Sequence, residues 1–200
     1  MVDGRRLRGE ATRERILATA RRLFGERGYE ATSIELVLES SGVARGALYH
    51  HFASKAELFD AVAEEVFVEI AARADEAAAA AGRDMLDRFR AGARAWLEMA
   101  IDPAVQRIAL TDPLIVLGWQ RWRALDEKHS LGSLRAGFAV LESEGRVPAG
   151  ESELLANLLL AALNEAALFI ASAKDQQAAL ATARRTIDAL LARLAPATVA

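Results

Sequence analysis

Apolar side chains recur three and four positions apart along most of this chain, which is the spacing of one face of an α-helix. Between Thr12 and Arg27 the apolar positions form one such stripe: Ile16, Leu17, Ala20, Leu23 and Phe24. Gly28 follows at once, and a glycine in the left-handed conformation commonly ends a helix. The pattern therefore predicts a first helix over residues 12–27.

Two shorter helices are expected after it. Either Thr32 or Ser33 can cap the first of them with a side-chain hydroxyl. Its buried stripe is short and consists of Ile34, Val37 and Leu38. Gly42 suits a tight turn after that stripe, and the next helix is expected over residues 44–51.

The helix expected at 44–51 has two different faces. Leu48 and Phe52 are four positions apart and share its buried face. The other face and its flanks carry Arg45, Gly46, Ala47, Tyr49 and His50. Two short helices joined by a turn with glycine form a helix-turn-helix motif, whose second helix enters the major groove of DNA. Residues 1–60 are therefore predicted to form a three-helix helix-turn-helix domain.

The rest of the chain also has helical periodicity. Helices are expected from residue 55 to the alanine run at 77–81, near 84–100, over 119–144, over 151–172 and over 175–194, with shorter pieces near Pro103 and Pro113. We therefore predict an all-α chain in which residues 61–200 form a C-terminal helical bundle.

Composition narrows the classes of function. Of the 200 residues, 52% are apolar and 26% are charged, as in a folded soluble protein. The chain has no cysteine, which excludes disulfides and cysteine-ligated metal centres and fits a reducing cytoplasm. Residues 1–55 hold ten Lys or Arg against seven Asp or Glu, whereas residues 56–200 hold fifteen against twenty-one. The basic N-terminal part favours a polyanionic partner.

One apolar segment, 154–173, has the length of a membrane span. Asn164 and Glu165 lie at its centre, where a charge in a bilayer costs roughly 2.5–3.5 kcal/mol or more. We therefore expect a helix buried on nearly all sides in protein. The basic start of the chain has no apolar stretch behind it and is not a secretory signal. The chain is expected in the cytoplasm, without a membrane partner.

A family resemblance is carried by ILATARRLFGERGYEATSIELVLESSGV at 16–43 and ARGALYHHFASKAELF at 44–59. This run resembles the DNA-binding domain of the tetracycline-repressor (TetR) family of bacterial transcriptional regulators. It departs from the family at Ala44, where a serine that caps the recognition helix is usual. The missing hydroxyl puts one phosphate contact and about 0.5–2 kcal/mol of helix stability in doubt.

Specific DNA contacts follow from the residue types on the predicted recognition helix. Arg45 can pair with a guanine edge or a phosphate, and Gly46 and Ala47 allow close approach of the backbone. Tyr49 and His50 can reach a phosphate, a sugar or a thymine methyl. Two further positions offer phosphate contacts: Thr32 and Ser33 through hydroxyls and backbone N–H groups and, by resemblance, Lys55 at a helix N-terminus.

The arginines at the start of the chain allow two interpretations. Arg5, Arg6 and Arg8 precede the first predicted helix. They could form an arm in the minor groove of DNA, or a soluble tail.

The adjacent His50 and His51 do not have the spacing of a metal pair, because helical ligand pairs are three or four positions apart. We expect His51 to be partly buried and His50 to face DNA. No nucleophile, phosphate-loop or zinc motif is present, and Asp126 and Glu127 are interpreted as ordinary surface charges. No catalytic residue, metal site or cofactor is therefore predicted.

The last two predicted helices are expected to form a dimer interface. Leu180, Ala183, Ile187, Leu190 and Leu194 follow alternating spacings of three and four. With the preceding apolar helix, they resemble the helix pair that forms a four-helix dimer interface in the TetR family. An intramolecular core is the alternative.

The resemblance also implies a site for a small-molecule effector inside the bundle. Pockets of this kind are largely apolar with few polar anchors. The predicted contacts are Trp96, Met99, Asp112, Trp119, Trp122, His129, Phe138 and Asn164. The segment 111–123 is expected to form one wall, because proline and glycine interrupt its helix and its tryptophans cluster. Core packing is the alternative for each of these residues.

These expectations describe a homodimeric repressor that binds a palindromic double-stranded DNA operator and is released by a small apolar or aromatic ligand. Two alternatives remain at this stage. One is a DNA-binding dimer that has no effector or activates transcription. The other is a small helical enzyme or carrier that shares only the N-terminal fold.

Overall fold

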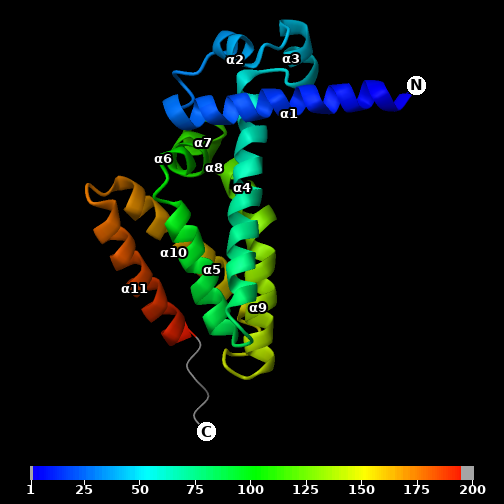
Figure 1. Cartoon of the computed structure of the whole chain (residues 1–200). Helices are drawn as coiled ribbons and strands as arrows, with labels where there is room; N and C mark the ends of the chain where they lie inside the picture. Colours follow the sequence, from blue (N-terminus) through cyan, green and yellow to red (C-terminus); the bar gives the residue numbers. More distant parts are fainter. Residues whose placement is uncertain (1, 195–200) are drawn as a thin grey trace. The chain divides into compact units, whose positions relative to one another are not determined.

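The computed structural model describes residues 2–194, with side chains from residue 6 onward, and all of its regular elements are helical (Figure 1). This confirms the predicted all-α class. Contacts between residues divide the chain into two compact units. The first joins the chain up to Val66 with Pro103–Trp122, and the second joins Phe67–Asp102 with the chain from Arg123 onward. These units are defined by contacts. The predicted division into a DNA-binding part at 1–60 and a C-terminal bundle at 61–200 concerns function and stays a prediction.

Helix α1 spans Val2–Arg27, so it begins well before the predicted start at Thr12. The backbone of Arg5, Arg6 and Arg8 therefore belongs to the helix and does not precede it as an arm. The early residues support this, because Arg6 and Glu10 form an i,i+4 ion pair and most of their neighbours are good helix formers. The periodicity missed residues 2–11 because this segment carries no apolar stripe.

The helix-turn-helix elements agree with the prediction. Helix α2 spans Ile34–Ser41, and α3 spans Arg45–His51. Gly28 and Gly42 both have a positive φ, which ends α1 and forms the turn between α2 and α3. Ser54 then caps α4, Lys55–Ala80, by accepting the backbone N–H of Glu57 at 3.1 Å.

The core of the first unit is aromatic where α1 meets the start of α4. The rings of Phe24 and Phe59 lie edge to face with centroids 5.1 Å apart, and Tyr29 packs on Phe59 at 5.2 Å. Leu48 and Phe52 are buried and belong to the same unit. The recognition helix is thus seated by its apolar face, which leaves the opposite face on the surface.

The first unit also contains a run of short helices from the middle of the chain. These are α6 (Pro103–Val105), the π-helix η1 (Gln106–Thr111), α7 (Asp112–Val116) and the start of α8 (Gly118–Asp126). The indole N–H of Trp122 donates to the carbonyl of Ala109 at 2.8 Å. Arg121 forms a two-pronged ion pair with Asp60 of α4, at 2.8 and 2.9 Å. The first bond closes the run on itself, and the ion pair holds the run to α4.

The second unit is a helical bundle. After the π-helix η2 (Glu127–Leu131) come α9 (Gly132–Ser143), α10 (Ser152–Ser172) and α11 (Gln176–Leu194), which pack with α5 (Met85–Met99). The predicted long helix at 119–144 is thus helical along its length but contains a π-helical turn. Gly137 allows α9 to approach α5, because a Cβ there would lie 2.6 Å from the ring of Phe89.

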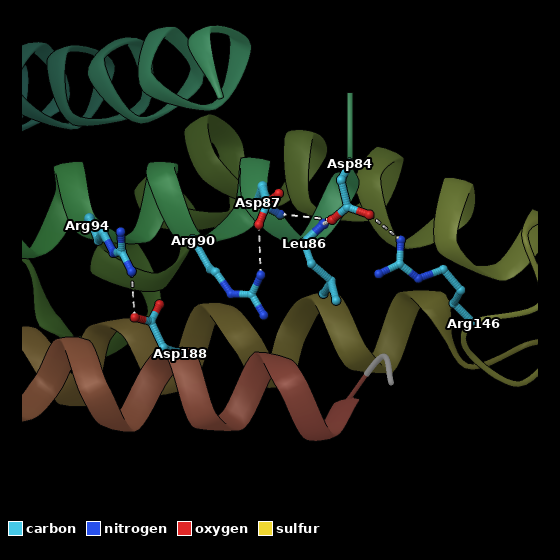
Figure 2. Close-up of polar contacts among 7 residues, drawn as sticks. All are labelled: Asp84, Leu86, Asp87, Arg90, Arg94, Arg146 and Asp188. Carbon is cyan, nitrogen blue, oxygen red and sulfur yellow. Dashed lines mark hydrogen bonds and ion pairs between the residues drawn. The ribbon is translucent and has the colours of Figure 1, made fainter. Parts of the chain in front are cut away.

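Ion pairs fix one end of this bundle (Figure 2). Asp84 caps α5 by accepting the backbone N–H groups of Leu86 and Asp87, and its other oxygen bonds to Arg146 at 2.8 Å. Further along α5, Arg94 pairs with Asp188 of α11 at 2.7 Å. This exposed pair links α5 to α11, which pack against each other.

Helix α10 departs from the expectation of burial on nearly all sides. It packs against α5, α9 and α11, but Leu154, Leu158 and Phe169 remain exposed. Among the described helices it alone is long and apolar enough to cross a membrane, and a core helix of a soluble protein passes the same test. The single chain therefore leaves an apolar face of α10 uncovered.

Candidate functional site

The recognition helix α3 presents one continuous exposed face. Arg45, Gly46, Tyr49 and His50 are exposed and Ala47 is partly exposed, while Leu48 is fully buried. A Cβ placed on Gly46 would meet nothing within 4 Å, so the helix backbone itself is accessible there. Five of the eight predicted DNA contacts therefore lie together on the surface that a helix-turn-helix offers to a major groove.

Arg45 does not stand alone on this face. Its Nη2 donates to Oε1 of Glu35 on α2 at 2.8 Å. The hydrogen bond to Glu35 raises the pKa of Arg45. The pKa of Glu35 is lowered first by its own backbone N–H and then by Arg45. Reasoning from the sequence did not identify Glu35 as a partner of the recognition helix.

The start of α3 confirms the missing cap. Ala44 takes the extended conformation of an N-cap residue but makes no side-chain hydrogen bond to the helix. The contrast with α2 is direct, because Ser33 there accepts the backbone N–H of Leu36 at 3.1 Å. The recognition helix therefore lacks the stabilisation that a hydroxyl would provide.

Thr32 has a different position from the one predicted. Its side chain is fully buried, and its hydroxyl makes contacts of 2.8 Å and 3.2 Å with the carbonyl oxygens of Gly28 and Leu23. The hydroxyl therefore ties the end of α1 to the start of α2 and is not available to a phosphate. Only the neighbouring Ser33 presents its side chain at the surface.

Lys55 is bound to the loop that precedes α2. Its Nζ donates to the carbonyl oxygen of Tyr29 at 3.0 Å and lies 3.9 Å from the centre of the Tyr29 ring. The side chain is half-buried. Lys55 thus supports the loop as well as standing at the start of α4, where a phosphate contact was predicted.

The two histidines have different surroundings, as expected. His50 is exposed, and His51 is half-buried with its ring 6.4 Å from that of Phe52. Their rings lie edge to face at 5.2 Å. Within the described part of the chain, no group of three His, Asp or Glu side chains is arranged to hold a metal ion.

The last turn of α1 and the loop after it are also supported by residues from the middle of the chain. Oδ2 of Asp112 accepts the backbone N–H of Tyr29 at 2.7 Å. Arg107 donates to the carbonyl oxygens of Gly25 and Glu26. A Cβ on Gly25 would lie only 2.8 Å from the Cβ of Ala104, so this approach requires a glycine. Asp112, which was predicted to contact an effector, here joins two segments of the first unit.

The eight predicted effector contacts are distributed over both units. Asp112, Trp119 and Trp122 belong to the first unit, where the tryptophan rings lie 5.1 Å apart. Trp122 is buried, whereas Trp119 is 62% exposed. The other five are in the second unit: Trp96, Phe138 and Asn164 are buried, and Met99 and His129 are half-buried.

A buried polar pair stands out in the interior of the second unit. Nδ2 of Asn164 donates to Oδ2 of Asp126 at 2.6 Å, and Asp126 is only 3% exposed. Burial raises the pKa of Asp126 to about 6, although the Asn164 bond and the charge of Arg123 oppose the rise. The interpretation of Asp126 as a surface charge was wrong. The signal was its spacing, four positions after the buried Trp122.

The predicted dimer seam is partly occupied within one chain. Leu180, Ala183 and Ile187 are buried in the bundle, and the stripe continues through Leu191, while Leu190 and Leu194 are partly exposed. The uncovered apolar surface lies instead on α10. Its exposed members Leu154 and Leu158 are one helical turn apart.

Comparison with known proteins finds two family models that match this chain. Residues 16–62 match the family model described as bacterial regulatory proteins, tetR family, and residues 86–194 match the tetracyclin repressor-like C-terminal domain. The crystal structure of a TetR-family transcriptional regulator from Pectobacterium atrosepticum is 36% identical in sequence, with a TM-score of 0.83. The match covers 96% of this chain and 98% of that one.

Two further relatives match over a smaller part. The Transposon Tn10 TetC protein of Escherichia coli is 27% identical over 153 residues, which are 75% of each chain. The HTH-type transcriptional repressor AcnR of Corynebacterium diphtheriae is 36% identical over 121 residues, 58% of this chain and 60% of AcnR. The C-terminal family model alone spans more than half of the chain, and both models describe regulators rather than enzymes. The chain therefore belongs to the TetR family of bacterial transcriptional regulators.

Proposed function

We propose that this protein is a homodimeric transcriptional repressor that binds a palindromic operator and is released from it by a small apolar or aromatic ligand. The observation that carries the proposal is the exposed face of α3, with Arg45 and Tyr49 on a helix whose other side is buried. The curated relative AcnR is named as a transcriptional repressor. Residues 1–60 would bind DNA, and residues 61–200 would bind the effector and the second protomer.

The proposed DNA contacts divide by their chemistry. Arg45 reads a guanine edge, while Gly46 and Ala47 let the helix approach the bases. Tyr49 and His50 contact phosphate, sugar or a thymine methyl, and Lys55 and Ser33 meet phosphates at the starts of α4 and α2. Phosphate contacts position the protein, whereas base contacts specify the sequence. Thr32 supports the α1–α2 loop from inside and is left out of the contact set.

The dimer would form through α10 together with α11. Leu154, Leu158 and Phe169 are exposed on α10, and burying large apolar side chains is the main driving force for association. A second copy of the chain would cover them by a two-fold axis. A symmetric dimer also places two recognition helices on the two halves of a palindrome.

The effector would bind in the second unit. That interior is apolar except for a few polar groups, among which Asn164 and Asp126 form a buried pair. A largely apolar pocket with few polar anchors suits a small aromatic or apolar molecule that carries a hydrogen-bonding group. Trp96, Met99, His129 and Phe138 are the further proposed contacts in this unit.

Release from DNA would be a population shift between two forms of the dimer. A ligand can shift that equilibrium only as far as it binds the two forms unequally. The run from Pro103 to Trp122 is the proposed relay, because Asp112 holds the loop that precedes α2 and Arg107 holds the last turn of α1. Trp119 and Trp122 stand at the other end of this run.

We place this regulator in the cytoplasm, with DNA, a second copy of itself and an unidentified effector as its partners. Its chemistry would need no cofactor and no catalytic residue. The apolar α10 would be covered by protein rather than by lipid.

The experiment that tests the proposal begins with selection of bound sequences from a random pool of DNA. The purified chain is expected to enrich a palindrome and to shift it as a dimer. Small aromatic and apolar metabolites are then tested for release of the selected DNA. Failure to enrich any sequence would remove the proposal, and enrichment without release by any ligand would remove its effector half.

A further inference from the structure

Glu35 is an acidic residue on α2 that lies beside the recognition helix. Its Oε1 is 2.8 Å from Nη2 of Arg45. Both side chains remain open to solvent, with 66% of the Glu35 side chain and 57% of the Arg45 side chain exposed. The two residues are ten positions apart, so the contact joins the two helices of the helix-turn-helix across their turn.

Stability does not account for this pair. An ion pair that is exposed to this extent adds little to the free energy of folding, because water screens it and two long side chains are immobilised. A carboxylate on this surface also opposes association with DNA, because the phosphate backbone is negative. An unpaired carboxylate beside the recognition helix would therefore weaken every complex with DNA.

The geometry of the pair suggests what the acid contributes. A guanidinium is a planar fork with several N–H donors, and Glu35 engages Nη2 alone. Tyr49 is a second hydrogen-bonding neighbour of this guanidinium, and the two neighbours together do not use all five of its N–H donors. A guanine presents two acceptors, O6 and N7, to such a fork in the major groove. The carboxylate restricts the rotamers of Arg45 before DNA arrives, so less side-chain freedom is lost when the base is read.

We infer that Glu35 is a positioning residue for base readout, which holds the Arg45 guanidinium in the orientation that contacts a guanine edge. This inference rests on the proposed function, because it requires Arg45 to read a base. Glu35 then lowers the affinity for all DNA and raises the discrimination between sequences. An Arg45 released from Glu35 would turn more readily to a neighbouring phosphate, which carries no sequence information.

The test compares Glu35→Gln with a matched control at one salt concentration. Glu39→Gln removes the same charge one turn further along α2, from an exposed side chain that does not pair with Arg45 in the described structure. Dissociation constants are measured for the selected operator and for an unrelated duplex of equal length. The readout is the ratio of the two constants, which a simple loss of negative charge leaves unchanged.

Glu35→Gln is expected to bind the unrelated duplex more tightly and to lower the specificity ratio by about tenfold, the scale on which one bidentate base contact discriminates. Glu39→Gln is expected to bind both duplexes more tightly and to keep the wild-type ratio. An unchanged ratio in Glu35→Gln overturns the inference. A thermal unfolding midpoint close to that of the wild type is expected for both variants, and a large drop for Glu35→Gln would assign the pair a structural role instead.

A double-mutant cycle separates positioning from direct contact. In an Arg45→Ala background, Glu35→Gln is expected to leave the specificity ratio where Arg45→Ala alone puts it. A further loss there would mean that Glu35 itself accepts from a base, and it would overturn the inference. A wild-type protein that binds no sequence specifically removes the proposed function, and with it the inference. A specific wild type with an unaffected Glu35→Gln removes the inference alone.

Discussion

The side chain of Asp112 accepts the backbone N–H of Tyr29 at 2.7 Å, although the two residues are 83 positions apart in the chain. Tyr29 follows the glycine that ends α1, and its carbonyl is bound by Lys55. The short loop before α2 is therefore bound by Lys55 of α4 and by Asp112 from the middle of the chain. Any change in the segment that carries Asp112 reaches this loop through a directional bond.

Asp112→Ala should unfold at a lower urea concentration than the wild type. The change leaves the part-buried N–H of Tyr29 without its acceptor, which costs about 1–3 kcal/mol. Asp112→Asn keeps an acceptor oxygen and should lose less. Urea titration of both variants measures the difference, and equal stability of Asp112→Ala and the wild type would contradict the assigned bond. In the repressor that we propose, ligand-triggered release of DNA should also weaken in Asp112→Ala.

Arg45→Ala and Lys55→Ala should affect DNA binding in different ways. Loss of Arg45 should weaken both duplexes, because it removes a positive charge and leaves Glu35 unpaired. It should weaken the selected operator about tenfold more than unrelated DNA, because a base contact is also lost. Loss of Lys55 should weaken both duplexes and reduce the slope of log K against log salt by about 1, because a phosphate contact is lost. Fluorescence anisotropy over a series of salt concentrations measures both effects. A uniform loss for both variants would place Arg45 on a phosphate.

Asp126 should make the stability of the chain depend on pH between about 4 and 6. Its pKa rises from 3.8 to about 6 on folding, so the folded state holds a proton over a range in which the unfolded state has released it. Stability therefore falls as pH rises through this window, by up to about 3 kcal/mol, and is level above it.

Asp126→Asn should remove this dependence. The amide of Asn164 would still find an oxygen acceptor, and the cost of burying a charge would disappear. The variant should gain up to about 3 kcal/mol at pH 8 and almost nothing at pH 4. Chemical denaturation across this range measures the gain, with Glu39→Gln as an exposed control. A gain of equal size at both pH values would mean that packing, not charge, is responsible.

Leu158→Glu should convert a dimer into monomers. The residue is exposed in the single chain and lies between Leu154 and Phe169 along the face of α10 that we assign to the partner. A charge there would be buried unpaired in the interface, which costs several kcal/mol. Val140→Glu on α9 is the matched control, since Val140 is also apolar and exposed but lies on another helix. Analytical ultracentrifugation distinguishes the two, and a dimeric Leu158→Glu would place the interface elsewhere.

Ala44→Ser should stabilise the chain by about 0.5–2 kcal/mol, because it supplies the missing N-cap of α3. The backbone at position 44 is already extended, so the hydroxyl needs no rearrangement to reach the helix. Thermal unfolding measures the gain, and Ser33→Ala at the cap of α2 should show a loss of similar size. An unchanged unfolding temperature in Ala44→Ser would mean that water already hydrogen-bonds to the backbone N–H groups at the start of α3.

Local sequence signals predicted the helices well because they act over a few residues. Gly28 and Gly42 ended helices where expected, and the apolar stripe of α1 became its buried face. The same signals did not distinguish Thr32 from Ser33, since both hydroxyls can cap a helix. That choice depends on what lies beneath the loop, which the local sequence does not contain.

The misplaced residues share a dependence on distant partners. The buried Asp126 bonds to Asn164 of α10, and Asp112 bonds to the backbone of Tyr29, 83 positions away in the chain. The spacing of Asp126 from Trp122 indicates its burial, but neither hydrogen-bond partner leaves a periodic pattern in the sequence. The start of α1 was missed for another reason: the side chains of residues 6–11 are mostly exposed, so this segment needs no apolar stripe.

The grouping of Pro103–Trp122 with the N-terminal helices has a practical consequence for engineering hybrid regulators. A hybrid that joins two parent proteins at residue 60 or 66 would take α2 and α3 from one parent. It would take the residues that contact the end of α1 and the loop after it from the other parent. Arg107 and Asp112 would then come from a chain in which their acceptors and donors differ. A chimaera that transplants these residues together with the N-terminal helices keeps the matched pairs, so the useful crossover points lie within α4 and α8 and after Asp102.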